Sequence, residues 1–552
     1  MKKIKVFGIR QKISNEKLVL QFLKELQKNI PKSAKELANM KNDFSLRMKI
    51  GNILNRELTV IAKKHNIDLP TKLQTLLQKR SVRTVSGVSP IGILTKPYPC
   101  PGQCVYCPTE DRMPKSYMAN QPAAARALRN KFHPYDQVKN RIIAMQESGH
   151  PVSKLEIIVM GGTWSFLPHN YQNWYVREVF RAANEGVSSG LTELQKANET
   201  TEHRIIGLTL ETRPDFITEK ELVRMRKYGC TRIEIGVQTL DDEVSKLTKR
   251  GHTRKHVAKA MKLMKDFGFK VCFHLMPGLP GTTIEKDLVW MKEIFGNPDF
   301  CPDFVKIYPC VVLETAELKK WWEKGDYKPY DDAELIKLLV QWQTFVPEWT
   351  RIMRLMRDIP ASSILGGAKF SNLRQILTSQ PKKLREIVGD KFYDEHDLDK
   401  NNNLFRDIRA REVGFKKGEK DLGIPVLKRR DYDASAGKEV FLSFETKDEK
   451  HLFALLRLRK PSGQQFENFK SVFKDAALIR EVHSYGGEIS VGKGEGLGQH
   501  RGLGRKLIIE AERIAKEEWG MSKMTIIAGV GTREYYRKFG YEEKCTYMTK
   551  KI

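Results

Sequence analysis

Five short apolar segments alternate with helical segments in the middle of the chain, and this alternation limits the fold more than any other feature of the sequence. The apolar segments cover residues 155–160, 205–210, 232–238, 270–275 and 304–308. Helical spacing of apolar residues lies between them, as at 219–228 and 254–267. Repeated strand–helix units predict parallel strands whose carboxyl ends carry the chemistry. We therefore expect an α/β fold in which residues 86–315 form a partial TIM-like barrel.

The regions on either side predict three further parts. Residues 1–85 are expected to form a helical module, because Leu18, Phe22 and Leu26 recur at helical spacing. Ser33 with Glu36 is typical of a capping box that opens a second helix there. Strands at 440–444, 451–458 and 524–528 and a helix at 502–518 indicate a second, mixed α/β domain over residues 437–552. Residues 316–436 are expected to connect the two domains.

The positive charge of the chain is unevenly distributed. Its 552 residues include 97 Lys and Arg against 67 Asp and Glu, a net charge of +30, and residues 1–99 hold 21 basic and 6 acidic side chains. Half of the surplus therefore lies in less than a fifth of the chain. A polyanion is the natural partner, because each neutralised phosphate releases condensed counterions. The alternative is a solvated basic face. We expect residues 1–85 to bind nucleic acid.

The sequence also favours a cytoplasmic protein with no membrane partner. No apolar stretch approaches the ~18 residues needed to span a bilayer. The first residues carry charge but lack the apolar core of an export signal. Eight cysteines in a cytosolic chain of this size do not suggest a disulfide framework.

Three of these cysteines, Cys100, Cys104 and Cys107, lie within eight residues. Three thiolates on one loop can each bind one iron of a [4Fe–4S] cluster and leave the fourth iron open. An open iron can chelate the amino and carboxylate groups of S-adenosylmethionine and pass an electron to its sulfonium, which yields a 5′-deoxyadenosyl radical. A zinc site is the alternative, but zinc sites usually pair two such units, and no second Cys or His pair follows at a useful spacing.

Residues at the ends of the predicted strands are candidates for binding S-adenosylmethionine. Gly161, Gly162 and Thr163 follow the strand 155–160, where backbone and hydroxyl can approach the methionine amino group. Later strands end in further polar candidates, namely Glu211, Arg213 and Gln238. The alternatives are a tight turn for the glycine pair and satisfied polar groups in the barrel mouth for the other three.

A second cofactor site is predicted near the C-terminus. The run Gln499-His-Arg-Gly-Leu-Gly504 leads directly into an amphipathic segment at 505–515. Glycines at a loop-to-helix junction expose backbone N–H groups to a pyrophosphate, and the helix dipole adds positive charge. With the strand at 524–528 after it, this run resembles motif A of the GNAT acetyltransferase superfamily. Residues 437–552 are therefore expected to bind acetyl-CoA.

Two adjacent tyrosines, Tyr535 and Tyr536, are the candidate catalytic residues of this domain. In GNAT-like domains a tyrosine at this place lies near the CoA thiol. Aromatic core packing is the alternative, and it suits Tyr541 better than Tyr535.

The three cysteines and the GNAT-like domain together resemble the catalytic subunit of Elongator, the tRNA wobble-uridine acetyltransferase family. The resemblance covers nearly the whole chain from about residue 80. Its most specific stretches are 80–90, 149–154, 159–163, 410–414 and 529–538.

The resemblance implies carboxymethylation at C5 of the wobble uridine of tRNA. Acetyl-CoA is hydrolysed, the deoxyadenosyl radical abstracts hydrogen from the acetyl methyl, and the carbon radical adds to C5. An electron donor for the cluster is a required partner. The sequence leaves open whether the chain is a homodimer or joins further subunits. Cys100, Cys104 and Cys107 would hold the cluster, and the implied acetyl-CoA contacts are Lys154, Arg480, Glu481, Val482, His483, Gly502, Leu503, Gly504 and Tyr535.

The chain departs from the family pattern at a structural zinc site between the domains. A His before Asn-Leu-Arg and a Cys before Arg-Asp often bind this zinc, and Phe370 and Phe405 stand near those places here. Phenylalanines cannot bind metal, so we expect the two rings to pack together as an apolar plug.

Two other functions stay open at this point. The GNAT-like domain could acetylate protein lysines while the cluster is structural, or the chain could be a non-catalytic tRNA-binding scaffold. The uneven basic charge argues against the first, and the intact cysteines and glycine turn argue against the second.

Overall fold

A computed structural model describes residues 16–78, 84, 86–370, 372–398, 405–415, 423–464, 466–486 and 502–552. The chain divides into two compact units. One comprises residues 1–85 and 139–152, and the other comprises residues 86–138 and 153–552. Within the described residues, none of the helices is long and apolar enough to cross a membrane.

Besides most of α6 (Pro134–Glu147), the described residues of the first unit form four helices around one apolar core. They are α1 (Glu16–Lys28), α2 (Ala34–Arg47), α3 (Asn55–Lys64) and α4 (Thr71–Leu77). Val19, Phe22 and Leu26 of α1 are buried in this core, as their spacing predicts. The Ser33 side chain accepts a hydrogen bond from the Glu36 N–H, and Glu36 Oε2 accepts one from the Lys32 N–H at 2.6 Å. Ser33 is therefore the N-cap of α2, as expected.

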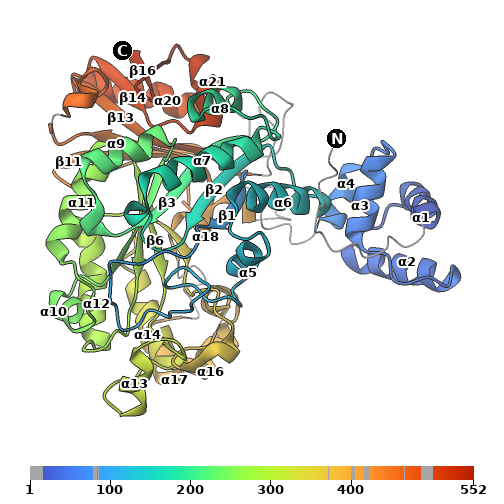
Figure 1. Ribbon diagram of the computed structural model, residues 1–552, viewed down its shortest axis with the longest axis horizontal. Coiled ribbons are helices and arrows are strands. Elements are labelled where there is room, and N and C mark those ends of the chain that lie inside the picture. Colours follow the sequence, from blue (N-terminus) through green and yellow to red (C-terminus); the bar gives the residue numbers. More distant parts are fainter. Residues whose placement is uncertain are drawn as a thin grey trace. The chain divides into compact units, whose positions relative to one another are not determined.

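The second unit contains a parallel sheet of seven strands in the order β1-β2-β3-β4-β5-β6-β8 (Figure 1). The strands are β1 (Ser89–Leu94), β2 (Lys154–Met160), β3 (Arg204–Thr212), β4 (Arg232–Gln238), β5 (Lys270–Leu275), β6 (Phe304–Ile307) and β8 (Arg351–Arg354). The five predicted strands are confirmed, and the sheet is the expected partial barrel, with β1 and β8 as its edges. Those two strands were not predicted, because β1 contains Pro90, which edge strands tolerate, and β8 is short and basic.

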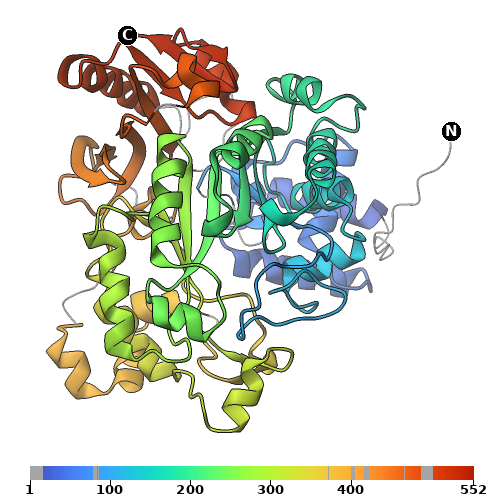
Figure 2. The same ribbon diagram turned by 60° about the vertical axis from the view of Figure 1, so that its left-hand side comes forward.

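Helices of the second unit cover the outer face of this sheet (Figure 2). Those following β2 to β5 are α7 (His169–Ala183), α8 (Leu191–Asn198), α9 (Glu219–Lys227), α10 (Asp242–Leu247), α11 (Arg254–Asp266) and α12 (Ile284–Gly296). The remaining helices up to residue 411 are α5 (Pro122–Arg129), α6 (Pro134–Glu147), α13 (Leu318–Glu323), α14 (Asp332–Gln343), α15 (Leu373–Ser379), α16 (Pro381–Val388), α17 (Asp390–Glu395) and α18 (Ile408–Arg411). Two short strands, β7 (Val312–Leu313) and β9 (Ile364–Gly366), form a separate pair.

A second seven-stranded sheet follows, in the order β10-β11-β12-β13-β14-β16-β15. Its elements are β10 (Val426–Ala434), β11 (Gly437–Glu445), β12 (Leu452–Lys460), α19 (Lys470–Phe473), β13 (Ala476–Ser484), α20 (Leu503–Arg513), β14 (Lys523–Ile526), α21 (Arg533–Arg537), β15 (Glu542–Lys544) and β16 (Tyr547–Lys551). The sheet begins at residue 426, so the expected start at 437 is wrong. Strand β10 was missed because it is an edge strand in which three of the four exposed positions are charged.

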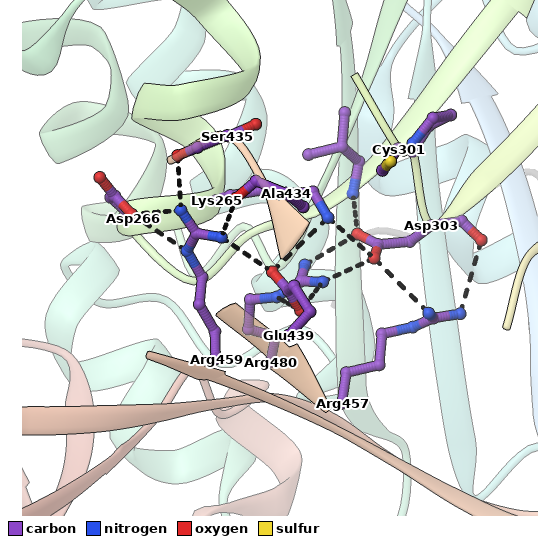
Figure 3. A network of polar contacts seen from close by, with 12 residues as sticks. Lys265, Asp266, Cys301, Asp303, Ala434, Ser435, Glu439, Arg457, Arg459 and Arg480 are labelled. Atoms are coloured by element: carbon purple, nitrogen blue, oxygen red, sulfur yellow. Dashed lines mark hydrogen bonds and ion pairs between the residues drawn. The ribbon is translucent and has the colours of Figure 1, made fainter. Parts of the chain in front are cut away.

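Buried ion pairs join the two sheets (Figure 3). Arg480 of β13 pairs with Asp303 at 2.6 Å and with Glu439 of β11 at 2.8 Å. It also donates a hydrogen bond to the carbonyl of Phe269 at 2.9 Å. Phe269 and Asp303 immediately precede β5 and β6. The second sheet therefore packs against the amino ends of the barrel strands.

Candidate active site

The loop that carries the three cysteines lies at the carboxyl ends of the barrel strands. Cys100 Sγ is 3.8 Å from Thr163 Oγ1, just after β2. The Val105 N–H donates to the carbonyl of Thr248 at 3.2 Å, which ties the loop to the segment after β4. Cys104 is buried and the other two cysteines are half-buried.

Arg250 is a further residue of this site that the sequence did not reveal. Its Nη1 donates to Cys104 Sγ at 3.6 Å, and its Nη2 donates to the carbonyl of Gly236. The pKa of the Cys104 thiol is lowered to about 4, because Cys107 donates a hydrogen bond to it and the Arg250 guanidinium outweighs burial. That hydrogen bond and burial raise the pKa of Cys107. The loop thus already stabilises a thiolate, the form that binds iron.

Unpartnered polar atoms beside the cysteines fit a bound amino acid. Arg213 is 5% exposed and pairs with Asp215, yet its Nη1 has no hydrogen-bond partner within the described chain. Thr95 Oγ1 is likewise without a partner there. Gly161 has a φ of 139°, and a side chain at this position would collide with Thr95. Three thiols, a close glycine turn and a buried guanidinium fit a cluster with one open iron and a ligand carboxylate.

The other two candidates at the strand ends, Glu211 and Gln238, differ in whether the protein already supplies a hydrogen-bond partner. Glu211 Oε2 accepts a hydrogen bond from Tyr117 Oη at 2.7 Å, so this carboxylate already has a partner in the protein. Gln238 has a φ of 70°, and its Oε1 has no hydrogen-bond partner among the described residues. Gln238 is therefore better placed than Glu211 to meet a ligand.

The expected acetyl-CoA site lies where β13 and β14 separate. The two strands pair in parallel only up to Ile479 and Ile526, while β13 continues to Ser484. A Cβ added to Gly504, in the first turn of α20, would lie 3.0 Å from Tyr535 Oη and 3.8 Å from a Val482 methyl carbon. The start of α20 therefore faces the end of β13 that has no β14 partner but still pairs with β12. Gln499, His500 and Arg501 lie outside the described residues.

Glycine at position 504 keeps the first N–H groups of α20 within reach of a ligand. Gly502 precedes the helix with a φ of 70°, and Leu503 is buried beneath it. Unsatisfied N–H groups and the helix dipole suit a pyrophosphate at this end.

The expected acetyl-CoA contacts on β13 fall into two groups. Val482 faces Gly504. The Arg480 side chain is committed to the ion pairs between the sheets, and Glu481 pairs with Arg457 at 2.8 Å. His483 Nε2 lies 2.8 Å from the carbonyl oxygen of Ser86, which precedes β1. Arg480 and Glu481 can therefore meet a ligand only through their backbone.

The two candidate tyrosines have different surroundings. Tyr536 is buried in the core of the second sheet, edge-on to Tyr535 at 5.3 Å between ring centroids. Tyr535 is half-buried with its hydroxyl toward Gly504, and burial raises its pKa, so the hydroxyl stays protonated. Of the two, only Tyr535 lies beside the start of α20.

Each of the two phenylalanines at the expected zinc site has a cation beside its ring. Phe370 lies beside the Lys383 ammonium, 5.1 Å from the ring centroid, and Phe405 lies beside the Arg374 guanidinium at 4.8 Å. The joint apolar plug stays a prediction. Each ring contacts a different cation, and neither ring offers a metal ligand.

Comparison with known proteins gives two family matches. Residues 98–290 match the Radical SAM superfamily, and residues 302–383 match the Radical SAM C-terminal domain.

Several curated relatives match over most of their length. A "tRNA uridine(34) acetyltransferase" of Methanocaldococcus infernus is 40% identical over 97% of this chain and 98% of its own. One of Dehalococcoides mccartyi is 43% identical over 86% of this chain and 100% of its own. "Elongator complex protein 3" of Homo sapiens is 38% identical over 87% of each chain.

A solved structure is also similar. The archaeal Methanocaldococcus infernus Elp3 with an N-terminal deletion has a TM-score of 0.71 and 41% identity. The match covers 85% of this chain and 100% of that one.

Proposed function

The chain belongs to the family of the tRNA uridine(34) acetyltransferases and Elongator complex protein 3, and from this premise we propose that it attaches an acetyl-derived carboxymethyl group to C5 of the wobble uridine of tRNA. The chain is an enzyme of the radical S-adenosylmethionine superfamily, whose members use a [4Fe–4S] cluster and S-adenosylmethionine. The acyl donor of an acetyltransferase of this family is acetyl-CoA.

Residues at the carboxyl ends of the barrel strands would hold the first two cofactors. Cys100, Cys104 and Cys107 would bind three irons, and Gly161 to Thr163 with Arg213 would hold the methionine end of S-adenosylmethionine. When bound and reduced, the cluster supplies the electron that cleaves S-adenosylmethionine and releases a 5′-deoxyadenosyl radical. The buried Arg250 would hold Cys104 in place through its hydrogen bond.

The second sheet would bind acetyl-CoA as a GNAT-like domain. The N–H groups at Gly502, Leu503 and Gly504 would bind the pyrophosphate, while the β13 backbone at Val482 and the Tyr535 hydroxyl would meet the pantetheine arm. The side chains of Arg480 and Tyr536 take no part, because both are buried elsewhere.

The proposed reaction balances without an external oxidant. A hydrogen atom would move from the acetyl methyl to the 5′-deoxyadenosyl radical, which becomes 5′-deoxyadenosine, and the resulting carbon radical would add to C5. The adduct then loses the C5 proton and one electron, which replaces the electron used to cleave S-adenosylmethionine. Water hydrolyses the thioester and releases CoA. A donor is still needed for the first reduction of the cluster.

The observation that carries this proposal is that one compact unit holds both the three-cysteine loop, at the barrel strand ends, and the glycine turn at the start of α20. A chain that only acetylated protein lysines would not need a three-cysteine loop with a thiolate-stabilising arginine at the strand ends. The basic helices α1 to α4 would bind the tRNA through its phosphates. We place the enzyme in the cytoplasm, where tRNA is found.

The test uses the full chain, reconstituted anaerobically with iron and sulfide, together with tRNA, dithionite, S-adenosylmethionine and acetyl-CoA. We expect 5′-deoxyadenosine and carboxymethyluridine to form together, and both to be lost in Cys104→Ala. Modified uridine that persists in this variant would contradict the radical step. Acetylation of peptides without S-adenosylmethionine would support a lysine acetyltransferase instead.

A further inference from the structure

Charged side chains line the inner face of the barrel sheet, whereas closed eight-stranded barrels usually pack Val, Ile and Leu there. Lys306 of β6 pairs with Glu234 of β4, and Arg232 of β4 pairs with Glu156 of β2. Neither pair joins neighbouring strands. Strands two apart approach each other only on the concave side of a curved sheet, so these four side chains point into the barrel.

Polar contacts continue along this inner face from the amino end. Lys270 Nζ, at the start of β5, is 3.9 Å from Glu481 of β13. Deeper in the barrel, Arg232 Nε is 3.4 Å from Glu234 Oε1, and His274 Nε2 is 2.8 Å from Glu234 Oε2. A series of polar side chains thus leads from the second sheet to the middle of the barrel.

The same series reaches the cysteine end. The His274 ring lies 5.3 Å from the ring of Tyr308, which follows β6. The Arg357 guanidinium lies 5.8 Å from the Tyr308 ring and 5.7 Å from the Tyr117 ring. Tyr117 in turn donates to Glu211, at the end of β3. Polar groups therefore extend over the whole length of the barrel interior.

This inner face keeps accessible surface. In β2, Glu156, Ile158 and Met160 are half-buried, while the residues between them, on the helix-covered side, are buried. The side chain of His274 is 15% exposed and that of Lys306 is 8% exposed. Paired charges of which some keep exposed surface suit a ligand site better than a fully closed structural core.

The two proposed cofactor sites lie at opposite ends of this interior. Lys154 opens β2 at the end that faces the second sheet, and Gly161 follows its other end. The seven residues of β2 span about 20 Å at ~3.3 Å per residue. An acetyl group bound at the second sheet must cover this distance to reach a radical formed beside the cysteines.

We propose that the acetyl end of acetyl-CoA enters the barrel from its amino end and is held among Glu234, His274 and Lys306, while the uridine enters from the carboxyl end. The ligand class is a short acyl thioester, and this inference rests on the proposed function. The Lys306 ammonium would donate to the acyl carbonyl oxygen. This site would hold the acetyl group for the hydrogen-atom transfer. In that step a C–H bond of the acetyl methyl breaks and a C–H bond of 5′-deoxyadenosine forms, with no net electron gained or lost.

The protonation of these groups agrees with that role. Burial opposes the charge on Lys306, but the attraction of Glu234 outweighs it and raises the pKa of the ammonium above its ordinary value. Burial also opposes the charge on Glu234, but Lys306 and His274 lower its pKa. Lys306 therefore remains a hydrogen-bond donor throughout the neutral range.

A direct test is photo-crosslinking with an acyl-CoA that carries a diazirine on a short acyl chain. The full chain is loaded with its cluster and irradiated without reductant, so that no turnover is required. We expect adducts on peptides containing 232–238, 270–276 and 304–308, and competition by acetyl-CoA. Adducts confined to β13, α20 and the outer surface would overturn the proposal.

A second test measures the coupling of the two chemistries, as modified uridine formed per S-adenosylmethionine cleaved. In Lys306→Met we expect this ratio to fall at least tenfold while CoA and S-adenosylmethionine still bind. Tyr308→Phe, which removes one hydroxyl, should lower it less. An unchanged ratio in both variants would overturn the proposal.

The matched control is Lys265→Met, because Lys265 is also a buried lysine between two carboxylates, at 3.8 Å from Asp303 and 3.5 Å from Glu439. It lies between the sheets, and its loss should leave the coupling ratio unchanged. If the unsubstituted chain forms no modified uridine, the proposed function fails. If it forms product and crosslinks only outside the barrel, this inference alone fails.

Discussion

The molecule contains two buried sets of ion pairs, one between the two sheets and one inside the barrel. They differ in how much side-chain surface is exposed to solvent. Asp303, Glu439, Arg459 and Arg480, between the sheets, are all without exposed side-chain surface. In the barrel interior, Glu234 is also fully buried, but its partners His274 and Lys306 keep accessible surface. Burial of charge alone therefore does not identify a site.

The partners of each set explain the difference. The ion pairs between the sheets join strand β13 to the segment before β6, some 177 residues away in sequence, and most hydrogen bonds of the Arg480 guanidinium run to Asp303 and Glu439. The pairs in the barrel join strands that are two apart in the sheet, and they lie between one proposed cofactor site and the other. The first set holds two layers together, and the second lines a space that a substrate can enter.

The largest expected effect is on stability, from breaking the pairs between the sheets. Asp303→Ala leaves Arg480 and Arg457 buried near a missing partner, and should lower the free energy of unfolding by about 3–5 kcal/mol. Chemical denaturation measures this. Asp358→Ala, which removes an exposed ion pair with Arg354, should cost no more than about 1 kcal/mol. Equal losses in the two variants would contradict the assigned roles.

The same pairs predict a dependence of stability on pH. Although burial opposes it, Arg480, Lys265 and Arg457 depress the pKa of Asp303 far below its ordinary value. A carboxyl with a lowered folded-state pKa contributes stability above its unfolded pKa of about 4 and loses it as pH falls further. The free energy of unfolding should fall below about pH 5, by up to about 1.4 kcal/mol per pH unit for each such proton. Asp303→Asn should show a smaller slope at acid pH than the unsubstituted chain.

A smaller effect is expected at the start of α20. Gly504→Ala would place a methyl group 3.0 Å from Tyr535 Oη and crowd the N–H groups proposed to bind pyrophosphate. Acetyl-CoA affinity should fall about tenfold, or ~1.4 kcal/mol, by isothermal titration calorimetry. Gly296→Ala is the control, since an added Cβ there meets nothing within 4 Å. Unchanged affinity in Gly504→Ala would place the CoA elsewhere.

The smallest expected effect is a shift of the cluster's reduction potential. Arg250 donates a charged hydrogen bond to Cys104 Sγ, which stabilises the more negative, reduced cluster. Arg250→Gln should therefore lower the midpoint potential measured by an electron paramagnetic resonance titration, with iron content retained. Lys249→Gln, next to it but paired with the exposed Glu317, should leave the potential unchanged. An unchanged midpoint potential in Arg250→Gln would contradict the proposal that Arg250 stabilises the reduced cluster.

The strands, the loop and the helix cap that the sequence predicted correctly are those that a pattern of neighbouring residues specifies. Strands β2 to β6 were found because their alternate residues are apolar on the helix-covered side, and the cysteine loop was found because its three thiols are close in sequence. The Ser33 cap was found for the same reason. In each case the information lies within a few neighbouring residues.

The parts that the sequence missed depend on contacts between distant residues. Arg250 reaches Cys104 from 146 positions away, and Lys306 reaches Glu234 from 72. Conversely, Arg480 was expected at the acetyl-CoA site, but its guanidinium pairs with Asp303 across the two sheets. Strand β10 escaped notice because charged side chains occupy positions on both of its faces, so that it lacks an apolar alternation.

The measurement that tests the account most directly follows a deuterium label from one proposed cofactor to the other. The reconstituted full chain is supplied with tRNA, reductant, S-adenosylmethionine and acetyl-CoA that carries three deuterium atoms on its methyl group. The account predicts that the 5′-deoxyadenosine carries one deuterium and the modified uridine two. Modified uridine formed alongside unlabelled 5′-deoxyadenosine would contradict the meeting of acetyl group and radical inside the barrel.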